Sequence, residues 1–226
     1  MKIESQEFKN RIEAFKMLFE VLPTSDMIKE DWIILAISTG GVPIALELSK
    51  RLFAQFDFFF SEKIYTRKNN QCEIAIITET KEIVIHEELM KAFDLQLENI
   101  YQESNDIYLN DIQEYKRKYR KDESLIDLEN KNVLIVDEGL NTGLTIMACI
   151  KSVINKKAKS ICVAVPVLPE ATINDIETIA DDLYYVDAPS HFISIDFYYE
   201  NLDEIKYEDI EKLIKEHKKE KHVNHL

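Results

Sequence analysis

Glycine is scarce in this 226-residue chain, which contains only four. Average usage would predict about 16. All four stand in two pairs, Gly40 with Gly41 and Gly139 with Gly143. Because glycine permits positive φ and close approach of the backbone to a ligand, this restriction indicates two loops that need it.

Cysteine and long apolar runs are scarce as well. The three cysteines, Cys72, Cys149 and Cys162, show no C-x-x-C spacing, which disfavours a zinc site or a disulfide framework and suits a reducing compartment. The longest apolar stretch, residues 161–168, is far shorter than the roughly 20 residues of a membrane span. The N-terminus also lacks the apolar segment of a secretion signal. We therefore expect a cytoplasmic protein.

Positive charge is the third deficit. The chain has 28 Lys and Arg against 42 Asp and Glu, so its formal net charge is −14. Nucleic acids and acidic membranes are bound mainly through clustered Lys and Arg, so both are excluded as expected partners. An anionic ligand would need local backbone donors or a divalent cation.

With 46% hydrophobic and 31% charged residues, the composition is that of a folded globular chain. We expect one domain, residues 1–226, with a core of about 30–205 and helical extensions at both ends. Apolar spacing predicts a first helix over residues 5–22. Continuous apolar runs predict strands at residues 32–37, 58–60, 133–136, 161–165 and 183–186.

Helices are predicted between these strands. Pro43 suits the first turn of one of them, and the others are expected at residues 97–120, 144–153 and 171–180. Residues 74–77 and 83–85 indicate a hairpin, whereas residues 63–71 show no periodicity. The alternation predicts an α/β fold with a doubly wound, mostly parallel sheet and helices on both faces. In such sheets, ligands bind at the carboxyl ends of the strands.

Residues 133–145 form the strongest local motif. Four apolar residues lead to Asp137 and Glu138, and a loop with two glycines and two threonines then opens a helix. A helix N-terminus and its free N–H groups favour a phosphate. The two acids could accept hydrogen bonds from sugar hydroxyls and stabilise developing positive charge. Alternatively, the acids and Thr142 only cap a strand and a helix, or the acids form a receiver-type pocket. The motif is neither a Walker loop nor G-x-G-x-x-G.

A second loop, Ser38-Thr39-Gly40-Gly41, has the same setting between an apolar strand and a helix. Two adjacent glycines permit a turn with exposed N–H groups, which is a second anion site. A purely structural turn is the alternative. Together, the two loops suggest a ligand with phosphates at both ends.

Residues 133–145 resemble the signature of type I phosphoribosyltransferases, which bind 5-phosphoribosyl-1-pyrophosphate (PRPP). Residues 35–45 resemble the family's pyrophosphate loop and the helix after it. Residues 163–167, 180–182 and 197–199 resemble a subgroup of uncharacterised bacterial phosphoribosyltransferase-domain proteins. The resemblance implies the type I fold, with a small hood and a β-hairpin insertion.

The resemblance also implies roles for individual residues. Asp137 and Glu138 would bind the ribose 2′ and 3′ hydroxyls and act in catalysis. The residues expected to hold the 5′-phosphate are Gly139, Leu140, Asn141, Thr142, Gly143, Leu144 and Thr145. The residues expected to hold pyrophosphate are Ser38, Thr39, Gly40 and Gly41. Mg²⁺ would bridge the pyrophosphate to the ribose oxygens without protein ligands.

The implied activity is that of a glycosyltransferase (pentosyltransferase) in nucleotide metabolism. It would transfer the phosphoribosyl group to a nucleobase or another small nitrogenous acceptor and release pyrophosphate. His191, Phe192, Phe197, Tyr198 and Tyr199 are candidates to stack on the acceptor. A homodimer is one possible oligomeric state. A non-catalytic sensor of PRPP or a nucleotide and a phosphohydrolase of PRPP are the alternatives.

Three departures from the family pattern bear on turnover. Glu62 stands where the subgroup has a cation, and the mobile-loop region lacks the subgroup's glycines. Lys63, Arg67 and Lys68 are expected to supply positive charge there. In 6-oxopurine enzymes of the family, an aspartate at the position of Asn141 contacts the purine N7 and handles its proton. Because an amide cannot titrate, this proton transfer is disfavoured here.

His217, His222 and His225 are expected on a solvated helix end.

Overall fold

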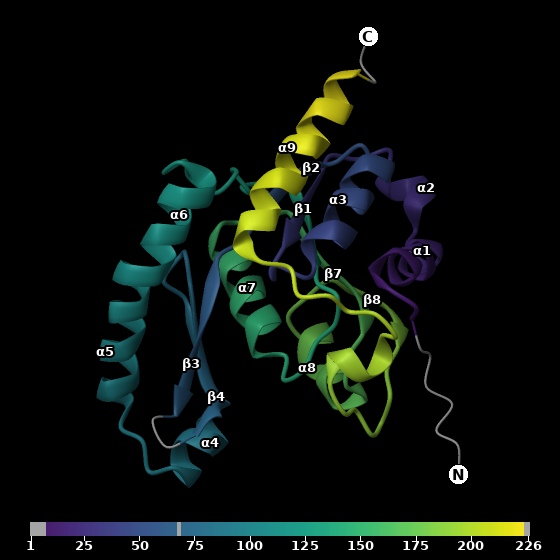
Figure 1. The fold of residues 1–226 in the computed structure, drawn as a ribbon. Helices are drawn as coiled ribbons and strands as arrows, with labels where there is room; N and C mark the ends of the chain where they lie inside the picture. The colour runs from purple at the N-terminus through teal and green to yellow at the C-terminus, as the bar shows by residue number, and fades with distance from the viewer. Residues whose placement is uncertain (1–7, 67–68, 224–226) are drawn as a thin grey trace.

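A sheet of five parallel strands forms the centre of the molecule (Figure 1). The computed structural model describes residues 8–66 and 69–223. The strand order is β2-β1-β6-β7-β8, and every neighbouring pair is parallel. The strands are β1 (Trp32–Ala36), β2 (Gln55–Phe58), β6 (Asn132–Val136), β7 (Ser160–Val167) and β8 (Asp182–Asp187). The predicted α/β fold is confirmed.

The chain order of the strands reverses between β1 and β6. From β1 the chain continues to its neighbour β2 on one side, whereas β6 lies on the other side and leads to β7. The pairing aligns Ala36 with Val136, so β1 and β6 end at the same level. Ligands of open α/β sheets bind at such a switch point. Both glycine loops follow these two strands directly.

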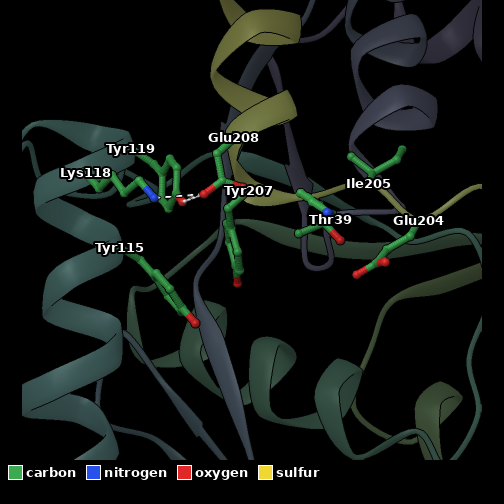
Figure 2. A pocket seen from close by; sticks show the side chains of 9 residues that line it. Thr39, Tyr115, Lys118, Tyr119, Glu204, Ile205, Tyr207 and Glu208 are labelled. Carbon is green, nitrogen blue, oxygen red and sulfur yellow. Dashed lines mark hydrogen bonds and ion pairs between the residues drawn. The ribbon is translucent and has the colours of Figure 1, made fainter.

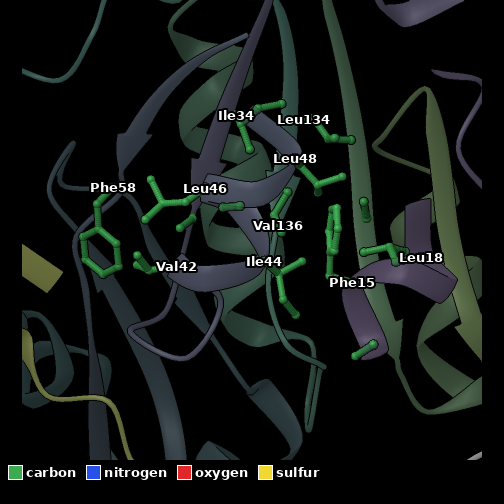
Figure 3. Packing of buried hydrophobic residues seen from close by; sticks show 14 of the residues in the cluster. Phe15, Leu18, Ile34, Val42, Ile44, Leu46, Leu48, Phe58, Leu134 and Val136 are labelled. Carbon is green, nitrogen blue, oxygen red and sulfur yellow. The ribbon is translucent and has the colours of Figure 1, made fainter. Parts of the chain in front are cut away.

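Alternate residues of the strands face two separate cores, as the pleat of a sheet requires. Ile34, Ala36, Leu134 and Val136 belong to a cluster with helices α1 and α3 (Figure 3). Their neighbours along β1 and β6 belong to a second cluster with α7 and α8. The helices of these layers are α1 (Arg11–Val21), α2 (Thr24–Met27), α3 (Val42–Arg51), α7 (Leu144–Asn155), α8 (Ile173–Glu177) and α9 (Tyr207–Val223).

A smaller antiparallel sheet packs beside α7. Its strands are β3 (Ser61–Thr66), β4 (Asn69–Thr78) and β5 (Ile83–Ile85). Ile76 and Val84 pack on Leu144 and Ala148 of α7. The outer helices are α4 (Glu87–Ala92), α5 (Leu97–Ile107), the π-helix η1 (Tyr108–Ile112) and α6 (Gln113–Arg120). Figure 1 shows α5 and α6 running end to end along this sheet. The β4–β5 hairpin and the long helical segment are confirmed.

Several predicted boundaries were wrong. Residues 63–66 belong to β3 and residues 69–71 to β4. The sequence there shows no periodicity, because four of the six residues of β3 and five of the ten of β4 are polar and the pairing has register shifts. The strand predicted at residues 58–60 ends at Phe58. The first helix begins at Arg11, because the Asn10 side chain accepts hydrogen bonds from two amides of its first turn. Residues 5–7 lie outside the described residues.

Two C-terminal predictions also needed correction. The helix expected at 171–180 is a 3₁₀ turn, η2 (Glu170–Thr172), followed by the short α8. A further 3₁₀ turn is η3 (Ile195–Tyr198). His217 is buried, with its ring centroid 6.3 Å from that of Phe56, because α9 packs back onto the core. The side chains of His222 and His225 are not among those described. No described helix is long and apolar enough to cross a membrane.

Candidate functional site

The first glycine loop contacts the two acids that directly precede the second glycine loop, at the carboxyl ends of β1 and β6. We call residues 38–41 the first loop and residues 139–145 the second loop. The Ser38 hydroxyl lies within hydrogen-bond distance of Asp137 Oδ1 and, at 2.6 Å, of Glu138 Oε2. The Gly41 amide donates to Ser38 Oγ at 2.9 Å. Folding therefore joins the first loop to an acid pair that lies about a hundred residues further along the chain.

The glycines make this close contact possible. A Cβ atom at Gly40 would overlap the Glu138 carboxylate, and one at Gly41 would lie 2.9 Å from Asp137 Cα. Gly143 has a φ of +76°, which L side chains rarely adopt. The interpretation of the scarce glycines as loop residues is thus supported by close approach at the first loop and by positive φ in the second.

Gly41→Ala is expected to lower the free energy of unfolding by about 1–3 kcal/mol, a typical cost of overpacking. The added Cβ would meet backbone atoms of Val136 and Asp137, which are held in and beside β6 and cannot turn aside. Gly40→Ala is the matched variant, because its Cβ meets the flexible end of Glu138. Urea unfolding of both variants measures the difference. Equal stability of the two would contradict this account.

Asp137 and Glu138 differ in their environments. Asp137 is buried, with 6% of its surface exposed, whereas Glu138 is half-buried. Burial, and secondly the negative charge of Glu138, raise the pKa of Asp137 well above its usual range. The Ser38 hydroxyl has one hydrogen and two carboxyl groups beside it, so a proton on Asp137 relieves the repulsion between the acids. The acid pair therefore accepts hydrogen bonds and favours ligands that donate them.

Backbone amides of both loops are free to bind an anion. Within the described residues, the amides of Thr39 and Gly40 in the first loop donate no hydrogen bond, and neither do those of Asn141, Thr142 and Gly143 in the second. Helix α3 begins directly after the first loop and α7 begins at Leu144 within the second. Among the described residues, the first-turn amides of Ile44, Thr145 and Ile146 donate no hydrogen bond. Each loop therefore presents free amides of the kind that bind anions.

Some residues predicted to hold the 5′-phosphate do not offer a free amide. The Leu140 amide donates to the Val167 carbonyl at 3.0 Å. The side chains of Leu140 and Leu144 are buried in the hydrophobic clusters. Their contribution in this structure is packing that holds the loop. Thr145 lies in the first turn of α7.

Lys63 and Glu62 point to opposite faces of β3, as successive residues of a strand do. Lys63 forms an ion pair with Glu73 at 2.9 Å. Burial lowers the pKa of Lys63, but the carboxylates of Glu73 and Asp137 outweigh this effect, so the net direction is upward. Lys63 is thus a cation within electrostatic reach of the acid pair. Arg67 and Lys68 lie outside the described residues.

Glu62, the acid that stands in place of a family cation, faces α6 instead. Its carboxylate pairs with the Tyr115 hydroxyl, and burial raises its pKa. Glu62 therefore takes part in holding α6 against the small sheet.

The aromatic segment predicted to meet the acceptor lies against the second loop. Asn141 Oδ1 accepts a hydrogen bond from the Ile195 amide at 3.2 Å. Tyr198 and Tyr199 are almost fully buried, so their role is packing and hydrogen bonding. Phe192 stacks on Tyr198 at 5.1 Å. His191 and Phe197 remain exposed and are available to a ligand.

A cavity of about 390 Å³ adjoins the first loop (Figure 2). Thr39 lines it together with side chains of α6 and the start of α9. Tyr207 stacks on Tyr115 at 4.4 Å and on Tyr119 at 5.1 Å, and Lys118 pairs with Glu208 at 2.9 Å. The sequence pattern did not predict this cavity, because its two walls come from segments almost ninety residues apart.

Arg11 is a second feature that the sequence reasoning missed. Its Nε donates to the Gly40 carbonyl at 2.9 Å, and its Nη1 donates to the Asp203 carbonyl at 2.9 Å. In the sequence, Arg11 is one polar residue of an amphipathic helix, and no local pattern distinguishes it.

The chain is similar to known proteins over most of its length. The family model for the phosphoribosyl transferase domain matches residues 9–201. Two curated relatives from strains of Mycobacterium tuberculosis, provisionally named as phosphoribosyl transferases, are each 22% identical over 181 residues. The match covers 79% of this chain but only 40% of each relative.

The fold is shared with a solved structure. The protein TT1426 from Thermus thermophilus superposes with a TM-score of 0.72 at 21% identity, over 92% of this chain and 97% of that one. The five-stranded parallel sheet, the two loops at its switch point and the match over residues 9–201 lead to one conclusion. The chain belongs to the phosphoribosyl transferase domain family, the type I phosphoribosyltransferases.

Proposed function

We propose that this protein transfers the phosphoribosyl group of PRPP to a small nitrogenous acceptor. One observation carries the proposal: two loops with free amides flank an acid pair at the end of adjacent strands. The second loop would hold the 5′-phosphate, and Asp137 and Glu138 the ribose hydroxyls. The first loop, with Lys63 nearby, would hold pyrophosphate.

The proposed reaction joins an acceptor nitrogen to the anomeric carbon of ribose. The bond from that carbon to the pyrophosphate oxygen breaks, and pyrophosphate leaves with the electron pair. The nitrogen then loses its proton to solvent. The acids would stabilise the positive charge that develops on the ribose, while the loop amides and Lys63 would stabilise the leaving group.

The residues present fit Mg²⁺ that arrives with the donor. Among the described residues, no group of three or more His, Cys, Asp or Glu side chains could hold a metal ion. Mg²⁺ is commonly held by substrate phosphates rather than by an all-protein cage. When bound, it would neutralise charge on the pyrophosphate. The protein's own part is to orient the donor and exclude water.

The acceptor is proposed to bind over the second loop, beside residues 191–197. The Asn141 contact with Ile195 places this segment there, and Phe197 offers an exposed ring. Because the Asn141 side chain is an amide that already accepts this hydrogen bond, it does not serve as a base. A nucleobase or another small nitrogenous compound fits this position, and we propose a cytoplasmic role.

The test measures binding and turnover separately. We expect PRPP with Mg²⁺ to bind by calorimetry, and we expect pyrophosphate release only when an acceptor from a panel of nucleobases and small amines is present. Binding without release on any acceptor would support a sensor. Release without an acceptor would indicate a phosphohydrolase. Absence of PRPP binding would contradict the assignment of the loops.

A further inference from the structure

The N-terminal segment and the segment after η3 pair beside the site. The Phe8 amide donates to the Tyr198 carbonyl at 2.8 Å, and the Glu200 amide donates to the Phe8 carbonyl at 2.8 Å. Phe8 and Tyr199 form a β-bridge, and their rings lie 5.1 Å apart. We call this pairing the terminal bridge. One of its strands leads directly into α1, and the other continues towards α9.

Arg11, the first residue of α1 and three residues after Phe8, contacts the first loop. Its Nε donates to the Gly40 carbonyl, while the amide on the other side of that peptide, Gly41, donates to Ser38. The Gly40–Gly41 peptide is therefore held at both ends. Within the described part of the chain, no carboxylate lies within ion-pair distance of Arg11. Its side chain is committed to the carbonyls of Gly40 and Asp203.

Tyr199, in the terminal bridge itself, holds the second loop. Its hydroxyl donates to the Glu138 carbonyl at 2.7 Å, directly before Gly139. Burial, and secondly the charge of Glu138, raise the pKa of Tyr199, so the hydroxyl stays protonated and remains a donor. Arg11 is close enough to act electrostatically on the same hydroxyl. The terminal bridge and the start of α1 thus contact the first loop and the residue directly before the second loop.

We propose that Arg11 and Tyr199 are positioning residues that set the separation of the two loops for a ligand that spans both. This inference rests on the proposed function. A ligand with two binding groups gains from both sites only if their spacing matches its own length. A ligand that occupies one loop has no such requirement.

The test compares one-loop and two-loop ligands. Calorimetry measures the affinity of Arg11→Met, Arg11→Lys and Tyr199→Phe for PRPP with Mg²⁺, pyrophosphate with Mg²⁺, and ribose 5-phosphate. For Arg11→Met and Tyr199→Phe, we expect PRPP affinity to fall by about tenfold or more, because the effective concentration of the second group drops. The one-loop ligands should change by less than about threefold. Arg11→Lys should recover part of the PRPP affinity, since it keeps one donor.

An equal loss for all three ligands would show a merely structural role and overturn the inference, as would unchanged PRPP affinity. If the wild-type chain binds none of these ligands, the proposed function fails instead. Amide hydrogen exchange then tests positioning without a ligand. We expect faster exchange at the hydrogen-bonded amide of Gly41 in Arg11→Met and at that of Leu140 in Tyr199→Phe, with β6 unchanged. Unaltered exchange in both variants would refute the positioning role.

Discussion

Asp137→Asn is expected to weaken PRPP binding by roughly 10–150-fold and, at the same time, to raise the free energy of unfolding at neutral pH. The loss of binding follows from the proposed role of the carboxylate as acceptor for a ribose hydroxyl. A hydrogen bond to a charged group contributes about 1.5–3 kcal/mol, which corresponds to roughly 10–150-fold in affinity. Adding Glu138→Gln removes the second acceptor and should deepen the loss.

The gain in stability follows from the raised pKa of Asp137. Above the unfolded pKa of about 3.9, the folded chain retains a proton that the unfolded chain has lost. Stability therefore falls as the pH rises through the folded pKa. Asparagine cannot ionise, and it keeps an oxygen for the Ser38 hydroxyl and the Glu138 amide. The variant should thus lose this part of the pH dependence.

Urea unfolding at pH 5 and pH 8 measures the stability of both proteins, and calorimetry with Mg²⁺ measures PRPP binding. Asp26→Asn is the matched control, because Asp26 is an exposed acid that pairs with the exposed Lys29. The control should leave both quantities nearly unchanged. If Asp137→Asn binds PRPP as the wild type does, the acid pair is not the ribose site. If the stability of Asp137→Asn changes with pH as that of the wild type does, the ionisation of Asp137 does not cause the pH dependence.

Arg120→Met is expected to lower the free energy of unfolding by about 3–5 kcal/mol, the usual cost of breaking a buried ion pair from one side. The Arg120 side chain is only 8% exposed. It contacts Glu79 at 2.5 and 3.0 Å, lies 3.5 Å from Asp57 and donates to the Phe58 carbonyl. Methionine would leave the buried Glu79 carboxylate and the half-buried Asp57 carboxylate without their cation.

The loss should grow with pH. Burial raises the pKa of Asp57, and Arg120 opposes this effect, so its removal raises that pKa further. A folded pKa above the unfolded one costs stability as the pH rises through it. Urea unfolding at pH 5 and pH 8 should therefore show a larger difference from wild type at pH 8.

Arg117→Met is the matched control on the same helix. Arg117 is exposed and donates to the Gln113 carbonyl one turn away, at 3.4 Å, so the change should stay within about 0.5 kcal/mol. Equal effects of the two variants would show that the Arg120 contacts do not stabilise the fold. Because Arg120 ties the end of α6 to the segment that leads into β3, its loss should also loosen the strand that carries Lys63.

Local patterns were sufficient for the parts of this protein that depend on neighbouring residues. The buried parallel strands β1, β6 and β7 were predicted because strands covered on both faces form continuous apolar runs. The two loops were predicted because glycine is so restricted. The polar strand β3 was missed, since its pairing partner and not its own apolar pattern makes it a strand.

The sequence by itself determined the fold class and both loops, because the signals for a buried strand, a glycine turn and a helix start all lie within a few residues. Only the tertiary structure decided how the loops meet. The Ser38 contact with Glu138, the Arg11 contact with Gly40 and the burial of His217 each join distant segments. Such contacts depend on the order of the strands and on the packing of helices, which no local window contains.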